Sequence, residues 1–368
     1  MLACPRPIVG HSYPRRLAAD AKVNSGAPRM GNETTDAGSP SFLGDVPGGT
    51  DVPLWRRLLT SQEFWVTVAV FALGVAVTFI TSRFATLTNL GNVLQNFCYI
   101  GLMAIGMTPI LITGGIDISV GSILGLCGVV LGLLLQAGWP LWAGLVATLA
   151  LGAALGGFNG ALIAYLRLPP FLVTLGMLSV ARSMALVVSD GQVVYNFGGS
   201  ENALFAIGGK LLGVPSVLYA TLLAALILQI LLSMTRWGRY IFAVGGNARA
   251  ARLTGIPVKR LKVSAYAFGG LMAAVTSVFL VAWLGSVTNA LGQGDELRVI
   301  AGTVIGGASL AGGYGTAYGA VIGSLLIEEL RNALLLAGVN PFWQGTFIGS
   351  VIVLAIILQR IQVTEEED

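Results

Sequence analysis

Long apolar runs, separated by short polar segments, dominate the chain from Phe64 onward. Charged residues are absent from the stretches 84–116, 118–166, 211–235, 263–294, 299–327 and 332–359. A helix crosses the hydrocarbon core in about 20 residues, so some of these stretches correspond to one span and others to two. Division at clusters of Gly, Pro and Asn predicts about ten helices. They lie at 64–82, 94–112, 117–135, 141–165, 171–188, 213–234, 262–284, 298–311, 316–336 and 343–360.

The two ends of the chain have a different composition. Residues 1 to about 55 are rich in Pro, Gly, Ser, Asn and Asp and lack apolar periodicity, so we expect a disordered cytoplasmic tail. The segment 56–362 is then the transmembrane domain, and 363–368 forms an acidic C-terminal tail.

The short loops predict the orientation of the helices, because Lys and Arg collect on the cytoplasmic side of a membrane. An N-in, C-in arrangement leaves only Arg83, Lys210 and Arg298 at the exterior face. The basic residues that it places at the cytoplasmic face are Arg56, Arg57, Arg167, Arg236, Arg239, Arg249, Arg252, Lys259, Arg260, Lys262 and Arg360.

Composition supports an all-α integral membrane protein. Of the 368 residues, 55% are hydrophobic and only 10% are charged. A soluble domain of this length has a much higher share of charged residues. The net charge of +4 therefore reflects topology, and no nucleic-acid partner is implied. Cys98 and Cys127 lie in apolar segments, where a buried small side chain is expected. With one histidine in the chain, nothing indicates a metal site.

The sequence lacks the motifs of an energy source or of an enzyme. Its only Gly-Lys pair, Gly209-Lys210, is followed by leucine, so a Walker loop is absent. It also lacks a nucleophile elbow and any close grouping of His, Cys and acids. Ionisable residues at mid-membrane depth are few, which favours energy supplied by another subunit over ion coupling.

The segment TGGIDISVGS, residues 113–122, contains the only acid between Glu63 and Asp190. Asp117 has two interpretations: an N-cap of the helix 117–135 that accepts from the N–H of Ser119 or Val120, or a residue of substrate binding or gating. The GG-x5-G spacing of Gly114, Gly115 and Gly121 recurs at Gly306, Gly307 and Gly313. It predicts two loosely repeated halves, as in many transporters, although 50 glycines also produce such matches by chance.

The cytoplasmic loop 235–262 is the largest polar feature of the membrane domain. Its basic residues act at least as a positive-inside anchor. Within it, Gly245 and Gly246 break the chain, Asn247 can cap, and residues 248–254 form a short helix with small side chains, stopped by Gly255. Such a helix at the membrane surface suits the cleft of a partner protein.

Four motifs together carry a resemblance to a known family. TGGIDISVGS, NGALIAYLRLPPFLVTLGML (159–178), the TRWGRY…GGNARAARLTGI loop and VIGGASLAGGYGT resemble the permease subunits of bacterial ABC importers for ribose, xylose and related monosaccharides. The match runs in order from about residue 60 to 360, and the long N-terminal tail departs from the family pattern.

The resemblance implies a function and partners. Family members are paired subunits of the bacterial inner membrane, energised by ATP and Mg²⁺ on separate ATPase subunits and supplied by a periplasmic sugar-binding protein. No cofactor is then expected on this chain. The family's ATPase-coupling loop maps to Gly246, Asn247, Ala250, Ala251, Gly255 and Ile256.

A further group of residues is predicted to line or gate the substrate pathway. Polar groups within apolar spans can contact sugar hydroxyls, and they can equally form hydrogen bonds between helices. The candidates are Asn96, Gly114, Gly115, Asp117, Ser119, Asn159, Thr174, Gly306 and Gly307. Two alternative functions stay open, an ion-coupled secondary sugar transporter and a membrane scaffold without transport, and the sequence does not select one sugar.

Overall fold

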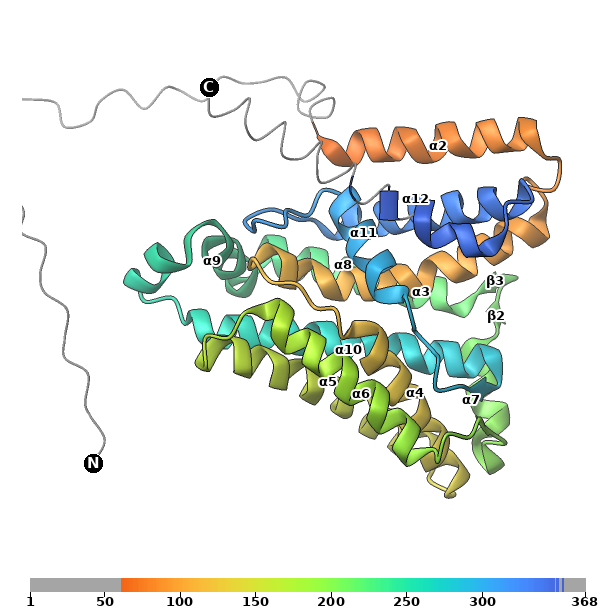
Figure 1. Ribbon diagram of the computed structural model, residues 1–368, viewed down its shortest axis with the longest axis horizontal. Coiled ribbons are helices and arrows are strands. Elements are labelled where there is room, and N and C mark those ends of the chain that lie inside the picture. The colour runs from red at the N-terminus through yellow and green to blue at the C-terminus, as the bar shows by residue number, and fades with distance from the viewer. Residues whose placement is uncertain (1–60, 348, 351–352, 354–368) are drawn as a thin grey trace, which may run out of the picture. The chain divides into compact units, whose positions relative to one another are not determined.

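The computed structural model describes residues 61–347, 349, 350 and 353, and the chain there is α-helical apart from short strands (Figure 1). The longer helices are α2 (Gln62–Ile80), α3 (Leu87–Ile112), α4 (Val120–Gln136), α5 (Leu141–Tyr165), α6 (Pro170–Val188), α8 (Ser216–Met234), α9 (Arg236–Leu253), α10 (Val258–Leu284), α11 (Asp295–Ile305) and α12 (Ala317–Leu336). The shorter elements are α7 (Glu201–Gly208), the 3-10 helices η1 (Gly198–Ser200) and η2 (Pro341–Trp343), and the strands β1 (Val194–Tyr195), β2 (Lys210–Leu211), β3 (Val214–Pro215) and β4 (Ser286–Val287).

Every helix predicted between 64 and 336 has a counterpart, with three differences. Helix α7 and the first half of α9 are not predicted, and the predicted helix 298–311 ends at Ile305 because Gly306 and Gly307 terminate it. The predicted helix 343–360 is helical at 344–347, 349, 350 and 353, and its other residues beyond Trp343 lie outside the described part. The tails at 1–55 and 363–368 also lie outside it.

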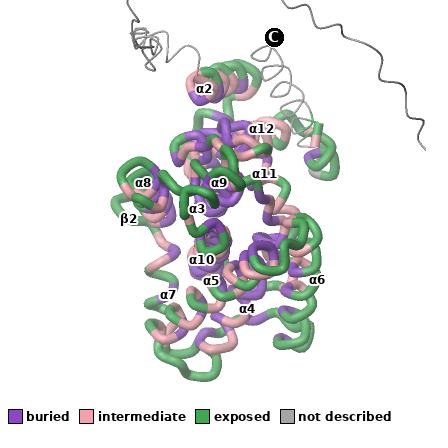
Figure 2. The backbone as a smooth tube through the Cα atoms, turned by 90° about the vertical axis from the view of Figure 1, so that its left-hand side faces the viewer, coloured by how far each residue is buried: buried purple, intermediate pink, exposed green. Residues whose placement is uncertain are grey.

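Helices α3 and α10 form the centre of the domain. From Phe97 to Ile112 every residue of α3 is buried, and α10 packs along α3, α4 and α5 (Figure 2). Cys98 and Cys127 are buried free thiols, as expected. The outer helices expose large apolar side chains such as Phe79, Trp142 and Leu172. Six described helices, α2, α3, α5, α6, α8 and α10, are long and apolar enough to cross a membrane.

Glycines allow two helix pairs to approach closely. On α5, Gly152 and Gly156 lie against backbone atoms of α10, where an added Cβ would overlap the carbonyl oxygens of Gly270 and Tyr266. On α11 and α12, Gly306 faces Gly319 in the same manner. Small residues spaced by four positions are a usual means of helix association in membranes, where the lipid gives no hydrophobic drive between helices.

Candidate functional site at the glycine-rich turns

The break between α3 and α4 contains the buried acid Asp117. After Ile112 the chain reaches Gly114 with φ +72°, and the N–H groups of Gly114 and Gly115 donate to the carbonyls of Leu111 (2.8 Å) and Ile110 (3.0 Å). These two bonds are those of a Schellman helix end, which requires a left-handed residue and therefore favours glycine. The chain then runs without helix until α4 begins at Val120.

Asp117 orients this break but is not the helix cap. Its Oδ1 accepts from the backbone N–H of Ser119 at 2.8 Å and from the Ser119 hydroxyl at 2.5 Å, and the residue is 1% exposed. The bond from the Ser119 N–H was predicted and is confirmed. The N-cap position belongs to Ser119, so the predicted cap role is wrong. Asp117 closes an Asx turn instead, which sets the direction in which the chain enters α4.

Side chains from three further helices meet the segment 116–119. Asn159 on α5 donates from Nδ2 to the Ser119 hydroxyl at 3.0 Å. The hydroxyls of Thr174 on α6 and Tyr266 on α10 lie 3.5 and 3.3 Å from the carbonyl oxygen of Ile116. The structure therefore brings together Asp117, Ser119, Asn159 and Thr174, and these four side chains are buried.

Two features of this cluster bear on the predicted pathway. Asn159 Oδ1 is buried without a hydrogen-bond partner among the described residues, so one acceptor is left over at its centre. Asn96, by contrast, donates to the carbonyl of Asn92 on its own helix at 2.9 Å. It lies about four helical turns from Ile112 and does not join the cluster.

The second glycine pair ends a helix in the same way, with a shift of one residue. Gly307 has φ +102°, and the N–H groups of Gly307 and Ala308 donate to Val304 (2.9 Å) and Thr303 (3.0 Å). The left-handed residue is thus the second glycine of this pair and the first of the other. Gly121 lies inside α4 whereas Gly313 lies in the loop before α12, so the third glycines are not equivalent. The two-half repeat stays a prediction.

The two turns and the bend of α9 meet at one place. The N–H of Gly313 donates to the carbonyl of Ile112 at 2.9 Å. A Cβ on Gly245 would overlap that same carbonyl oxygen and lie 2.5 Å from the nitrogen of Gly313. A Cβ on Gly312 would lie 3.0 Å from the Gly245 carbonyl oxygen and 3.1 Å from the Gly114 nitrogen. Backbone thus contacts backbone among three segments far apart in sequence.

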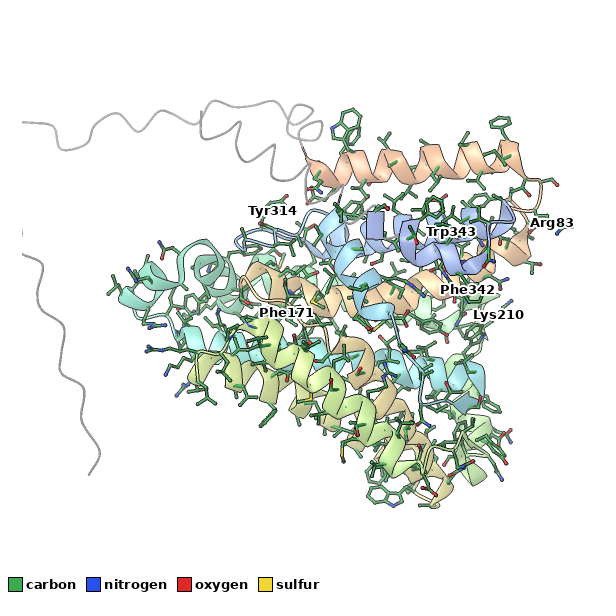
Figure 3. The ribbon with its side chains drawn as sticks, in the orientation of Figure 1. Arg83, Phe171, Lys210, Tyr314, Phe342 and Trp343 are labelled. Atoms are coloured by element: carbon green, nitrogen blue, oxygen red, sulfur yellow. The ribbon has the colours of Figure 1, made fainter. Side chains whose placement is uncertain are left out.

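The first residues of α2 hold the second turn. The Gln62 side chain donates to the carbonyl of Ile305 at 3.0 Å, and Glu63 Oε1 accepts from the hydroxyls of Tyr314 (3.0 Å) and Thr316 (3.2 Å). Figure 3 shows Tyr314 near the end of the loop that follows α11. Burial raises the pKa of Tyr314 to about 12, and the Glu63 carboxylate adds to this, so the hydroxyl stays protonated and donates.

Helix α9 contains the predicted coupling segment as its second half. Asn247 leaves the helical region, with φ −156° and ψ 97°, and its Oδ1 accepts from the N–H groups of Arg249 and Ala250, both at 3.0 Å. The helix then ends with bonds from Gly255 to Arg252 and from Ile256 to Ala251, both 3.1 Å. The predicted cap at Asn247 and the stop at Gly255 are confirmed as local structure, whereas the break lies at Asn247 and not at Gly245 and Gly246, which are helical.

The residues mapped to coupling differ in exposure. Gly246, Asn247, Ala250 and Gly255 are exposed and Ile256 is half-buried. Ala251 is 5% exposed and packs into the core, whereas Leu253 is 85% exposed. The outer surface of this short helix therefore presents small residues and one leucine, flanked by arginines. Leu253 was not singled out from the sequence, although its place in an otherwise polar turn was visible.

The predicted helices 262–284 and 298–311 leave a non-helical connection between α10 and α11, but its packing against α4 was not predicted. Residues 285–294 run along α4, where added Cβ atoms on Gly121 and Gly125 would meet backbone of Gly292 and Leu291. Arg182 on α6 donates to the carbonyls of Asn289 (2.8 Å) and Leu291 (2.9 Å), so it stabilises this segment and makes no ion pair with a described residue. Glycines 121, 125, 128 and 132 share one face of α4, a pattern that could have indicated a backbone neighbour.

The charged residues of α11 and α12 form local pairs. Glu328 and Arg331, spaced i, i+3, pair at 2.9 Å, and Arg331 also donates to Gln344 at 3.1 Å. Arg298 pairs with Asp295 at 3.0 Å within α11. It lies one turn inside α11, and its assignment to the exterior face stays a prediction.

Comparisons with known proteins place this geometry in a family. A family model described as "Branched-chain amino acid transport system / permease component" matches residues 89–356. The ribose import permease protein RbsC of Escherichia coli (strain K12) is 39% identical over 297 residues, which cover 80% of this chain and 92% of that protein. No solved structure matches the chain.

Two further relatives agree with this assignment. The "Probable ABC transporter permease protein y4mJ" of Sinorhizobium fredii is 37% identical over 272 residues, covering 74% of this chain and 81% of that protein. The autoinducer 2 import system permease protein LsrC of Shigella flexneri is 34% identical over 303 residues, covering 82% and 88%. The chain therefore belongs to this permease family, as a multi-pass inner-membrane transport subunit of the ABC sugar-importer type.

Proposed function

We propose that this chain is the permease subunit of an ATP-driven importer that translocates a monosaccharide of the ribose class by alternating access. Its membership of the family and the 39% identity to a ribose import permease support this substrate class. ATP and Mg²⁺ act on separate ATPase subunits, and a periplasmic binding protein delivers the sugar. Xylose is a second substrate of the same class.

The proposed topology has ten spans, N-in and C-in, in two loosely repeated halves, and two permease subunits form a pair. The positions of basic residues support the orientation. Arg83 and Lys210, both assigned to the exterior, lie at the end of the helices opposite α9, which carries the cytoplasmic arginines (Figure 3). This separation is what the positive-inside rule requires.

One observation carries the mechanism, namely the contact of the α9 bend with both glycine turns. Closure of the ATPases moves the second half of α9, from Asn247 to Leu253. At Gly245 no side chain separates the bend from Ile112 and Gly313, so the displacement passes directly to the end of α3 and to the loop between α11 and α12. Packed backbone transmits such a shift because it is not freely deformable.

The pathway proposal is narrowed by the same geometry. Asp117, Ser119, Asn159 and Thr174 surround the first turn, so movement of Gly114 and Gly115 alters their mutual contacts. We assign them to a gate that is closed in this conformation, with Asn159 Oδ1 as an acceptor ready for a sugar hydroxyl. Gly306 and Gly307 are the hinge of the second turn. Asn96 is a pathway residue only if the outer half of α3 faces the substrate.

Uptake measurements test the function. Cells that express the chain with its ATPase and binding protein are given labelled ribose, xylose, autoinducer 2 or leucine, the last two because of the relatives' names. We expect ribose or xylose uptake that survives collapse of the proton gradient while ATP is maintained. Uptake that stops with the gradient would indicate an ion-coupled secondary transporter. A chain whose deletion changes no solute movement would be a scaffold.

A further inference from the structure

A basic pocket lies beside α9, between the end of α5 and the starts of α6 and α10. Its volume is about 290 Å³, and Gly114, Ile163, Ala248 and Val258 form part of its wall. Four cationic side chains line it, and no acidic residue does: Arg167, Arg252, Lys259 and Lys262. None of the four makes an ion pair with a described residue. Lys259 Nζ lies 5.1 Å from the centre of the Tyr165 ring.

The backbone at this pocket is held in an unusual conformation. Arg167 has φ +57°, in the left-handed region that non-glycine residues rarely adopt. Such strained backbone persists where the surroundings fix it, commonly at ligand sites. Arg167 lies in the four-residue connection between α5, which ends at Tyr165, and α6, which begins at Pro170.

An apolar groove continues from the basic pocket between α5 and α6. Its volume is about 350 Å³, and Leu168 lines both cavities. Phe158 and Leu162 of α5 and Leu172 and Val180 of α6 are among its walls, and most of these side chains are exposed on the outer surface of the bundle. Asn159 also lines the groove.

We propose that the pocket and the groove together bind one anionic phospholipid, with the phosphate among the four cations and an acyl chain in the groove. Opposite charge explains the head-group end, and basic pockets between membrane helices on the cytoplasmic side are suited to phosphate head groups. An acidic protein segment or free phosphate would satisfy the cations but leave the groove unexplained. The inference rests on the proposed orientation, which puts the pocket at the cytoplasmic leaflet.

The lipid site borders the candidate transport site. Gly114 of the first turn and Ala248 and Arg252 of α9 line the pocket, and Asn159 connects the groove to Ser119. A lipid bound here contacts α9 on one side and α5 and α6 on the other. Because a ligand stabilises the conformation to which it binds, the lipid favours the packed state of the turns.

Lipid retention by the purified full-length permease, without its partners, tests the head-group end. Native mass spectrometry counts bound lipids after exchange into nanodiscs of phosphatidylcholine, alone or mixed with phosphatidylglycerol. We expect one retained phosphatidylglycerol, and a loss of about tenfold in its affinity in the double variant Lys259→Gln/Lys262→Gln. The matched control Arg239→Gln/Arg260→Gln removes the same charge from exposed residues outside the pocket and keeps the affinity.

A filling substitution tests the groove. Gly176 lines it, and a Cβ there meets nothing within 4 Å, so Gly176→Leu introduces a side chain into the groove at an open position. We expect it to weaken retention, whereas Gly91→Leu, also at an open position of a helix, has no effect. Unchanged retention in Gly176→Leu overturns the acyl-chain part of the proposal.

The remaining outcomes identify the other occupants. Full displacement of the lipid by inorganic phosphate would reduce the site to a free-anion pocket. Retained lipid with lost ATPase docking in Lys259→Gln/Lys262→Gln would assign the cations to an acidic partner segment. Since the permease is measured alone, lipid binding can fail while ATP-driven sugar uptake holds, and sugar uptake can fail while lipid binding holds.

Discussion

Gly245 and Gly246 are neighbours with opposite tolerance for a side chain. A Cβ on Gly245 would overlap backbone of Ile112, whereas one on Gly246 meets nothing within 4 Å. We expect Gly245→Ala to destabilise the protein by about 1–3 kcal/mol, as overpacking of a tight contact does. Thermal unfolding followed by intrinsic fluorescence measures the difference.

Gly246→Ala is the matched control for this substitution. It adds the same methyl group at the adjacent position, where there is space for it, and should leave the melting temperature close to that of the unaltered chain. Equal melting temperatures for both variants would contradict the close approach of the α9 bend to the first turn.

Asp117 acts through one oxygen, which makes asparagine an informative replacement. Asp117→Asn keeps an Oδ1 that can accept from the N–H and hydroxyl of Ser119, so the fold should be retained. The charge is lost, and we expect uptake to fall about fivefold, which corresponds to about 1 kcal/mol in the barrier. Labelled-sugar uptake normalised to membrane-inserted protein measures this.

Asp117→Ala separates structure from transport. It removes the acceptor, so the Asx turn is lost and the melting temperature should fall as well. Full uptake by Asp117→Asn with unchanged stability would show that the carboxylate has no special role in transport.

At the scale of the element, the second half of α9 offers one exposed and one buried alanine. The sequence predicts that a bulky charge at Ala250 or at Ala251 uncouples the ATPase. The structure separates the two, because Ala250 is exposed and Ala251 is packed into the core. Ala250→Glu should therefore reduce transport-coupled ATPase activity at least about tenfold without loss of stability.

The assembled complex, with sugar and binding protein, is the material for this measurement. Ala251→Glu serves as comparison: it buries an unpaired charge, so it should lower the melting temperature as well as the coupling. Normal sugar-stimulated ATPase activity in a folded Ala250→Glu variant would count against this helix as the coupling element.

Local signals explain what the sequence could predict. The cap at Asn247 and the stops at Gly114 and Gly255 depend on neighbouring residues, and each was found where expected. The packing of the segment 285–294 depends instead on α4, α6 and β1, which are distant in sequence. The partners of Arg182 are carbonyls, which the sequence does not mark. The helix after the first turn was predicted to begin at Asp117. It begins three residues later, at Val120, because the chain between Ile112 and Val120 is not helical.

At the scale of the molecule, the orientation can be tested with single cysteines. Lys210 and Arg239 are exposed, and Lys210 lies at the end of the helices opposite α9, which contains Arg239 (Figures 1 and 3). In a variant without the natural cysteines, we expect an impermeant maleimide to label Lys210→Cys in intact cells stripped of the outer membrane. Arg239→Cys should react only after the inner membrane is opened.

The two sites serve as each other's control in the same preparation. Labelling of Arg239→Cys from outside, with Lys210→Cys protected, would reverse the proposed topology. It would also place the basic pocket at the outer leaflet. The sugar specificity, which the uptake measurements test, does not depend on this result.

The segment 285–294 has a consequence for biosynthesis. It lies among glycines of α4 and is bonded by Arg182 of α6, both of which leave the ribosome before it. Polar backbone is tolerated at membrane depth only when protein surrounds it. The surface formed by α4 and α6 is thus made before residues 285–294, and the segment can move from the translocation channel directly onto it. A circularly permuted gene that encodes the segment ahead of α4 would expose it to lipid, and we expect such a product to be degraded.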